Sequence, residues 1–390
     1  MIIRRYILLI QNNIIFRRRL LTITLFVNYC GSLYLTISND IVGRVIAGLT
    51  LALSLVHAGL YVCFNRYQKK TIQWIIGYCI IFVAYRYCRR REILDLYTYV
   101  SFYSSEDSES INDTVLNTTI IFFVTTVFLC FAHIIPDAPL FLRGDTVRYT
   151  LGLNHPNAGG YYLYIIAGAY FFKSYRKPKG RGVLLLYALS VCSILIFNCR
   201  TSYIGILIIA SVYALKKVRI NSSECLLAMP GIRHMLSVAV VFFTFLTIGI
   251  SMHYWDSVYL NHLFETRLEN TYYFLQNYDI KLLGNAQVPE WHVVDGWSKR
   301  YLDSGYIQCL LKMGILNFLI YALFFGSAVE KSIQQRQYAT TYLLIIIALR
   351  LLVEASPLRW YFAIPLLYTN YGKMRKKKES VNSLLFYEPI

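Results

Sequence analysis

Residues 183–215 read VLLLYALSVCSILIFNCRTSYIGILIIASVYAL, and this stretch decides the fold class. Two apolar runs, at 183–198 and 202–215, are separated only by a short polar break around Arg200. Runs of roughly 16 to 24 residues recur along the chain, and about 20 apolar residues cross a bilayer core as a helix. Such runs are too long and continuous for barrel strands, the other structure that satisfies its backbone in lipid. The sequence therefore predicts an all-α, polytopic integral membrane protein.

The composition agrees with a membrane protein. Of the 390 residues 56% are hydrophobic and only 15% are charged, and the mean hydropathy is +0.45, whereas soluble domains carry about 25% charged residues. The net charge is +18, but Lys and Arg fall in short clusters between the apolar runs, which is typical of cytoplasmic loops. This pattern explains most of the charge without a nucleic acid. An anionic lipid substrate is the expected use of the remainder.

The cysteines and the first hydrophobic run indicate no processing or metal site. The nine cysteines are odd in number and lie mostly in or beside apolar runs, with no CxxC pair, so we expect neither disulfides nor a metal site. Arg17–Arg19 precede the run LLTITLFVNYCGSLYLTI without a small-residue cleavage site. We expect an uncleaved signal anchor, with residues 1–16 in the membrane interface.

The charge clusters predict the topology. Lys and Arg clusters at 17–19, 69–70, 173–181, 216–219, 331–336 and 373–378 are expected in the cytoplasm. An even number of crossings between 70 and 173 then requires the short segment EILDLYTYVSFY (92–103) as an additional span, which places the acidic SSEDSES (104–110) inside. The result is about twelve spans in the cytoplasmic (inner) membrane, with both termini cytoplasmic. The candidate spans are 20–37, 41–64, 71–87, 92–103, 115–135, 158–172, 183–198, 202–215, 235–252, 306–325, 338–353 and 360–372.

Three segments are expected outside a single membrane domain of residues 1–390. They are 136–157, 198–202 and the large extracytoplasmic loop 253–305. Within this loop, apolar residues at helical spacing predict short helices over 260–278 that cover a cavity at the membrane surface. The apolar positions are Leu260, Leu263, Phe264, Leu268, Tyr272 and Leu275.

Cationic side chains gather on the side where the positive-inside rule does not require them. Arginine binds phosphate oxygens bidentately and keeps its charge, and Arg200 lies between two spans, where a charge is costly and marks a functional site. We expect Arg143, Arg148, Arg200 and Arg359 to converge on one anion-binding cavity. Candidate substrate-binding residues are Arg143, Arg148, His155, Asn157, Arg200, Lys299, Arg300, Tyr306 and Arg359. The chain has no P-loop, DxD, HExxH or GxSxG motif, so we expect no ATP hydrolysis, cofactor or metal.

The stretch RYTLGLNHPNAGG (148–160) predicts a helix that starts near Pro156. Proline favours the first helical position, and Asn154 or Asn157 is the expected cap. Capping does not explain Arg148 and His155 in the same turn. A helix N-terminus offers free N–H groups and partial positive charge, which predicts an anion site.

Three motifs carry a family resemblance. RYTLGLNHPNAGGYYL (148–163), NCRTSYIG (198–205) and LLGNAQ (282–287) followed by YLDSGYIQCLLKMGI (301–315) resemble the Wzy-type polysaccharide polymerases of capsule and exopolysaccharide clusters, which are related to O-antigen polymerases and ligases. The resemblance covers most of the chain in span order and is best over 143–315. In place of the DN-x-Y often seen in the third motif, this chain has Asp303-Ser304-Gly305-Tyr306.

The resemblance implies a GT-C-like, metal-independent, inverting glycosyltransferase. It would join oligosaccharide repeat units carried on undecaprenyl pyrophosphate at the outer face of the membrane. The implied partners are this lipid-linked oligosaccharide, membrane lipid, and a chain-length regulator and flippase of the same pathway. The donor already holds its leaving group, whose developing negative charge arginines can stabilise.

The acceptor hydroxyl requires a base. His292, His155, Asp295 and Asp303 are the outside residues able to accept a proton. His155 suits hydrogen bonding at a helix N-terminus better, so we take His292 first and Asp303 second as catalytic residues. Two alternatives to the polymerase stay open. One is a ligase-like glycan transferase. The other is a lipid-linked oligosaccharide flippase, favoured by intramembrane charges at Arg44, Arg350 and Glu354.

Overall fold

The structure is a computed structural model that describes residues 14–65, 69–103, 106–137, 141–143, 146–220, 222–264, 266–289, 291–294, 298–354, 358–359 and 364–370. The chain divides into two compact units. The first unit contains the described residues within 14–66, 101–223 and 367–370, and the second contains those within 67–100 and 224–366. The helix α6 (Glu92–Tyr103) and the 3₁₀ helix η3 (Ile364–Asn370) are divided between the units.

The described part of the chain is mostly helical, as predicted. Two short hairpins that the sequence did not predict accompany the helices. One joins β1 (Phe141–Arg143) to β2 (Thr146–Arg148) in the first unit. The other joins β3 (Trp291–Val294) to β4 (Ser298–Tyr301) in the second.

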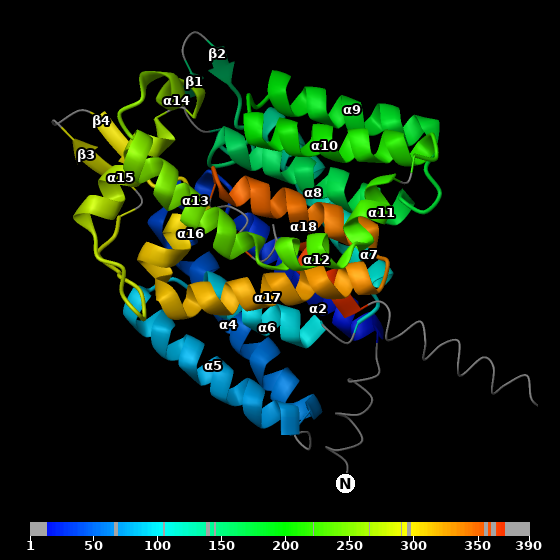
Figure 1. Cartoon of the computed structure of the whole chain (residues 1–390), viewed down its shortest axis with the longest axis horizontal. Coiled ribbons are helices and arrows are strands. Elements are labelled where there is room, and N and C mark those ends of the chain that lie inside the picture. Colours follow the sequence, from blue (N-terminus) through cyan, green and yellow to red (C-terminus); the bar gives the residue numbers. More distant parts are fainter. Residues whose placement is uncertain are drawn as a thin grey trace, which may run out of the picture. The chain divides into compact units, whose positions relative to one another are not determined.

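The first unit is a bundle of long helices that pack side by side, in parallel and antiparallel directions. Figure 1 shows α8, α9 and α10 side by side, and these three helices pack pairwise. Arg18 near the start of α2 donates to Ser110 near the start of α7, so these two helices run in the same direction. Asn112 of α7 donates to the carbonyl of Ala169 near the end of α8 (3.1 Å), so α8 runs the opposite way. The long helices are α2 (Ile14–Cys30), α4 (Asp40–Asn65), α7 (Ser108–Phe131), α8 (Pro156–Ser174), α9 (Gly180–Leu195) and α10 (Arg200–Lys217).

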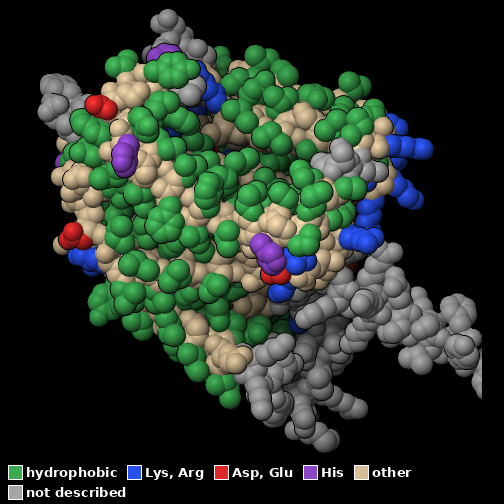
Figure 2. Space-filling model, in the orientation of Figure 1, with side chains coloured by type: hydrophobic (Ala, Val, Ile, Leu, Met, Phe, Trp, Pro, Cys, Tyr) green, Lys and Arg blue, Asp and Glu red, His purple; other side chains and the backbone are tan. Residues whose placement is uncertain are grey.

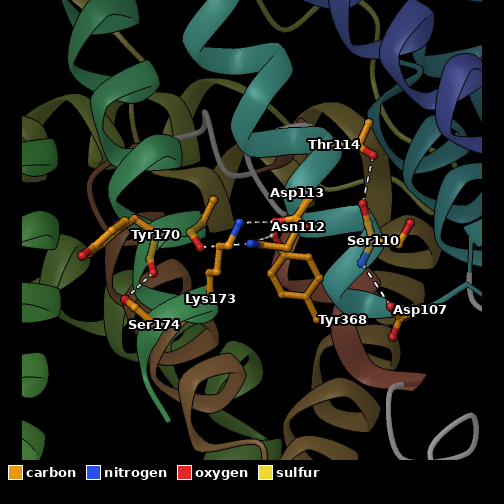
Figure 3. A network of polar contacts seen from close by, with 10 residues as sticks. Asp107, Ser110, Asn112, Asp113, Thr114, Tyr170, Lys173, Ser174 and Tyr368 are labelled. Carbon is orange, nitrogen blue, oxygen red and sulfur yellow. Dashed lines mark hydrogen bonds and ion pairs between the residues drawn. The ribbon is translucent and has the colours of Figure 1, made fainter. Parts of the chain in front are cut away.

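One end of the first unit is strongly basic. Figure 2 shows Lys and Arg side chains gathered where α9 begins and α10 ends. Acidic residues at the start of α7 lie at this same end, because Lys173 pairs with Asp113 (2.9 Å) and Arg176 with Glu109 (4.0 Å). Figure 3 shows the Lys173–Asp113 pair beside Asn112. The side-chain oxygen of Asn112 accepts a hydrogen bond from the hydroxyl group of Tyr368 (2.9 Å). The buried Arg17 likewise pairs with Glu106.

The second unit is built around a helix with a break in it. α16 (Gly305–Gln308) continues into a π-helical turn, η1 (Cys309–Met313), and then into α17 (Gly314–Gln334). α17 packs against α5 (Lys69–Cys88), α12 (Pro230–Ser237) and α18 (Tyr338–Leu351), and Figure 1 shows α12 lying along it. The helix α13 (Ala239–Tyr254) packs on α15 (Arg267–Asn277) and α16.

The backbone of residues 281–285 explains the break. This segment replaces part of the helical hydrogen-bond ladder around Gly314, which has φ +91°. Insertion of another group into the ladder is a common cause of a π-turn or kink. The bonds run from Asn285 N to Lys312 O (3.0 Å), from Ile315 N to Lys281 O (3.1 Å) and from Leu316 N to Leu282 O (3.1 Å).

The large loop contains the predicted short helices. α14 (Val258–Leu263) and α15 cover most of 260–278, which confirms that this segment is helical. A buried cluster that includes Phe274, Leu302 and Leu311 packs α15 against the start of the broken helix. The described part of the loop is therefore folded and packs on the rest of the second unit. Asp303 lies at its C-terminal end, two residues before α16 begins.

In the described residues, four helices are long and apolar enough to cross a membrane, or five if the pair α12 and α13, bent by 60°, is one span. The four are Asp40–Phe64, Thr71–Cys88, Ser108–Phe131 and Gly305–Gln334. The 12-residue α6 is only about 18 Å long, less than the roughly 30 Å of a bilayer core. The twelve predicted spans therefore stay a prediction. Part of the candidate span 360–372, and the basic cluster 373–378, lie outside the described residues.

Candidate functional site

The end of the first unit opposite its basic end holds the HPN segment. The carboxylate of Asp137 accepts hydrogen bonds from the Thr150 hydroxyl and from the backbone N–H of Gly152 (2.9 Å). Gly152 has φ +83°, a conformation that favours glycine. The N–H of Asn154 donates to the carbonyl of Ser32 (2.8 Å). These contacts hold residues 150–154 in a fixed turn before α8.

His155 caps α8. Its Nδ1 accepts the backbone N–H of Asn157 (3.1 Å), and Pro156 occupies the first turn as predicted. The predicted capping by Asn154 or Asn157 is wrong, because the imidazole ring takes that place. Since Nδ1 is an acceptor, the proton of the neutral ring lies on Nε2. The ring thus has a structural role at the helix start.

Arg148 joins the first motif to the residue directly before the second motif. Its Nε donates to the carbonyl of Phe197 (3.1 Å) and its Nη2 donates to the side-chain oxygen of Asn157. The structure therefore brings the turn 148–157 against the segment that precedes α10, although 49 residues separate Arg148 from Phe197. These contacts make Arg148 a clamp between the two segments, and they direct its guanidinium toward protein atoms.

Arg200 begins α10 and is exposed. Arg143 occupies the last position of β1, but its side chain lies outside the described part of the chain. Arg359 is exposed and belongs to the second unit. The expected convergence of these residues with Arg148 on one cavity therefore stays a prediction.

In the large loop (253–305) of the second unit, several of the predicted residues contact one another or α15. Arg300 of β4 donates to Glu269 of α15 (2.6 Å) and lies over the ring of Tyr273, 5.2 Å from its centroid. His292 is opposite Arg300 in the hairpin, and its ring lies 5.5 Å from that of Tyr273. These side chains tie the hairpin to α15. Lys299 is placed on β4, but its side chain, like the whole of Asp295, lies outside the described residues.

Asp303 lies at the end of the large loop, just before the broken helix begins at Gly305. Its carboxylate is half-buried and lies 3.5 Å from Nε of Arg267. Burial raises the pKa of Asp303 to about 6, with Glu354 acting in the same direction and Arg267 and Lys312 opposing it. A carboxyl group with such a pKa exchanges its proton near neutral pH, as a general base must.

Several charged side chains of the second unit are buried. Lys312 of η1 is 1% exposed. Arg350 of α18 pairs with Glu354 (3.3 Å), and both are buried. Sequence reasoning had treated Arg350 and Glu354 only as a hint of transport and had missed Lys312. The available signal was a charge within the apolar stretches LLKMG and LRLLVE.

Tyr306, predicted as a substrate contact, is buried, and its hydroxyl donates to the carbonyl of Ala348 (2.7 Å). In this arrangement it joins α16 to α18. The second unit thus contains a titratable carboxylate with an arginine next to it, and it also contains buried charged side chains.

Comparison with known proteins adds no family assignment, because no protein-family model, curated protein or solved structure matches the chain.

Proposed function

We propose that the chain is a multi-pass protein of the cytoplasmic membrane with about twelve spans and cytoplasmic termini. The exposed apolar side chains on the candidate spans support this proposal. Val45 on α4, Ile76 on α5 and Ile121 on α7 are each more than half exposed, at 54%, 55% and 62%. Water would disfavour such faces, whereas lipid accommodates them.

The basic end of the first unit supports the same topology. The acidic segment SSEDSES (104–110), which includes the first residues of α7, was expected inside the cell against the charge rule. Its pairing through Glu106 and Glu109 with Arg17 and Arg176 offsets its charge locally. The acidic residues are thus compatible with the cytoplasmic side.

For the activity, we propose polymerisation of oligosaccharide repeat units carried on undecaprenyl pyrophosphate. The observation that carries this proposal is Asp303, a carboxyl group with a pKa of about 6 that lies 3.5 Å from Arg267. It lies in the third motif of the family resemblance, at the end of a folded loop. A near-neutral base next to a cation suits a reaction in which a hydroxyl loses a proton and a phosphate group departs as an anion.

The proposed reaction is an inverting displacement. The acceptor hydroxyl oxygen forms a bond to the anomeric carbon while the bond from that carbon to the pyrophosphate oxygen breaks. The hydroxyl proton passes to the carboxylate of Asp303, and the electron pair of the broken bond leaves with undecaprenyl pyrophosphate. Arg267 is the proposed contact for the departing anion, and the ring of His292 packs near that of Tyr273 in the hairpin. A ligase-like transfer to another acceptor would use the same chemistry.

A flippase is the second candidate, favoured by a different observation. The ion pair Arg350–Glu354 and the side chain of Lys312 are buried beside a broken helix, and transporters place charges at such breaks. Arg44 is exposed near the start of α4, close to Asp40 (4.0 Å), so it is not one of these buried charges.

Deletion of the gene followed by sizing of lipid-linked glycans tests the proposal. Polymerisation predicts single repeat units on lipid that are exposed at the outer face. Loss of the flippase would instead leave single repeat units facing the cytoplasm, and unchanged polymer would contradict both functions. Asp303→Asn should reproduce the deletion, whereas Asp279→Asn, a change of an exposed aspartate in the same unit, should leave polymer length unchanged.

A further inference from the structure

The basic end of the first unit gathers cations from two stretches of the chain. One stretch is the turn between α8 and α9, and the other is the end of α10 with the turn that follows it. The backbone N–H of Lys179 donates to the hydroxyl of Tyr213 (3.0 Å), and Nζ of Lys216 lies 5.4 Å from the centroid of the Tyr175 ring. Both tyrosines are buried. They therefore hold the two basic stretches together, although 34 residues separate Lys179 from Tyr213.

Most cations of this end have exposed side chains that no carboxylate neutralises. The acidic residues Glu109 and Asp113 at the start of α7 are already paired with Arg176 and Lys173. Within the part of the chain that the structure describes, five further exposed cations of this end form no ion pair. These five residues, named here the basic patch, are Lys177, Lys179, Arg181, Lys217 and Arg219. The basic patch therefore presents an excess of positive charge that attracts anions.

The basic patch adjoins apolar side chains on α9. Arg181 is followed at helical spacing by the exposed residues Leu184, Val191 and Leu195, and residues at this spacing share one face of a helix. Leu184 and Leu195 are each 73% exposed. Figure 2 shows hydrophobic side chains along α9 that give way to Lys and Arg where the helix begins. In a bilayer, this row faces the acyl chains and Arg181 reaches the headgroups.

The end of α10 repeats this arrangement and indicates the kind of partner. Val218, which is 65% exposed, lies between Lys217 and Arg219, and the exposed Ile220 follows. A nucleic acid or an acidic protein would neutralise the cations but leave these apolar side chains in water. A bilayer surface accommodates both, because the apolar side chains enter the acyl region and the cations stay beside the phosphates. The mixture of side chains therefore favours lipid.

We propose that the basic patch binds the headgroup phosphates of anionic phospholipids in the leaflet that it faces. This proposal rests on the membrane location given under the proposed function, and it is independent of the polymerase activity. Arg181 and Arg219 can each engage two oxygens of one phosphate, and the lysines add compact positive charges. A zwitterionic headgroup carries a cation of its own, which opposes the basic patch. The basic patch therefore selects lipids with a net negative charge.

The test is a lipid titration of the purified full-length protein in detergent, in which native mass spectrometry resolves each bound lipid. The wild type should bind phosphatidylglycerol more tightly than phosphatidylcholine. The double variant Lys177→Gln/Lys179→Gln should bind phosphatidylglycerol roughly 10- to 30-fold more weakly, because each cation near an anionic surface contributes about a factor of five to association. The double variant Lys217→Gln/Arg219→Gln should show the same loss. Neither variant should change the binding of phosphatidylcholine.

The double variant Lys281→Gln/Lys331→Gln is the matched control. It removes two exposed lysines of the second unit, and it should leave the binding of phosphatidylglycerol unchanged. A rise in ionic strength should weaken this binding in the wild type, because salt screens exposed charges. Inorganic phosphate at the concentration of the lipid should not displace it.

Equal binding of the two lipids by the wild type, or an unchanged affinity for phosphatidylglycerol in both patch variants, overturns the proposal and leaves the cations as a topology signal only. If a patch variant does not fold, the wild-type salt series decides, and an affinity that does not fall with salt overturns it. Displacement by inorganic phosphate identifies a site for free anions and also overturns it. Selective binding of phosphatidylglycerol by a protein that forms no polymer would reject the polymerase while supporting this surface.

Discussion

Replacing Gly314 by alanine tests whether the contact between segment 281–285 and the broken turn holds the second unit together. Gly314 has φ +91° and ψ 166°, and a residue with a side chain in such a region costs about 1–3 kcal/mol. The added Cβ would also lie 2.2 Å from the nitrogen of Gly284 and 2.6 Å from the carbonyl oxygen of Leu282. The two backbones must then separate.

Separation of the backbones weakens the three hydrogen bonds that join them, each worth about 1 kcal/mol. Together with the strain, we expect a loss of about 3–5 kcal/mol in the free energy of unfolding. The assay is thermal unfolding of the purified protein in detergent, where the midpoint should fall by several degrees.

Gly249→Ala is the matched control for this change. Gly249 lies in the helix α13, and a Cβ atom there meets no described atom within 4 Å. Alanine in a helix is favoured over glycine by about 0.5–1 kcal/mol, so this variant should be as stable as the wild type or slightly more stable. A Gly314→Ala protein with the stability of Gly249→Ala would refute the explanation of the helix break.

Three further predictions concern the candidate site. The rate of polymer formation should rise with pH through about 6, because the ionised carboxylate of Asp303 is the active form and its pKa is about 6. A pH series on membranes measures this rate. In that series Asp303→Asn should lose both the activity and its dependence on pH. Arg148→Ala should destabilise the first unit by about 1–3 kcal/mol, measured by thermal unfolding, because the carbonyl of Phe197 and the side chain of Asn157 lose their donor; an unchanged midpoint would contradict the clamp. His292→Ala should retain polymer on a sizing gel, since Asp303 is the proposed base, and complete loss of polymer would return His292 to that role.

The helices were predictable because their signals are local. The apolar run at 41–64 gave α4, and Pro156 marked the first turn of α8. The spacing of Leu260, Leu268 and Leu275 correctly indicated helices in the large loop. The three-residue strands of the hairpin 141–148 are too short to show a periodic pattern, which explains why they were not predicted.

Contacts between distant segments were not predictable in the same way. The break at Gly314 depends on a backbone segment about 30 residues earlier in the chain, and the influence of Glu354 on Asp303 depends on the packing of α18 against α16. The cap of α8 is His155 rather than a neighbouring asparagine, because the turn before the helix is fixed by Asp137. The sequence shows which charged residues lie in or near apolar runs, but it does not show which of them pair in the folded chain, such as Arg267 with Asp303.

Reconstitution of the purified protein in lipid vesicles tests the central claim most directly. The vesicles contain an undecaprenyl-pyrophosphate-linked oligosaccharide and neither ATP nor a nucleotide sugar. The wild type should convert single repeat units into a ladder of longer glycans and release undecaprenyl pyrophosphate, and Asp303→Asn should leave single units. Single units that the wild type moves across the vesicle membrane without lengthening them would contradict the polymerase and identify a transporter.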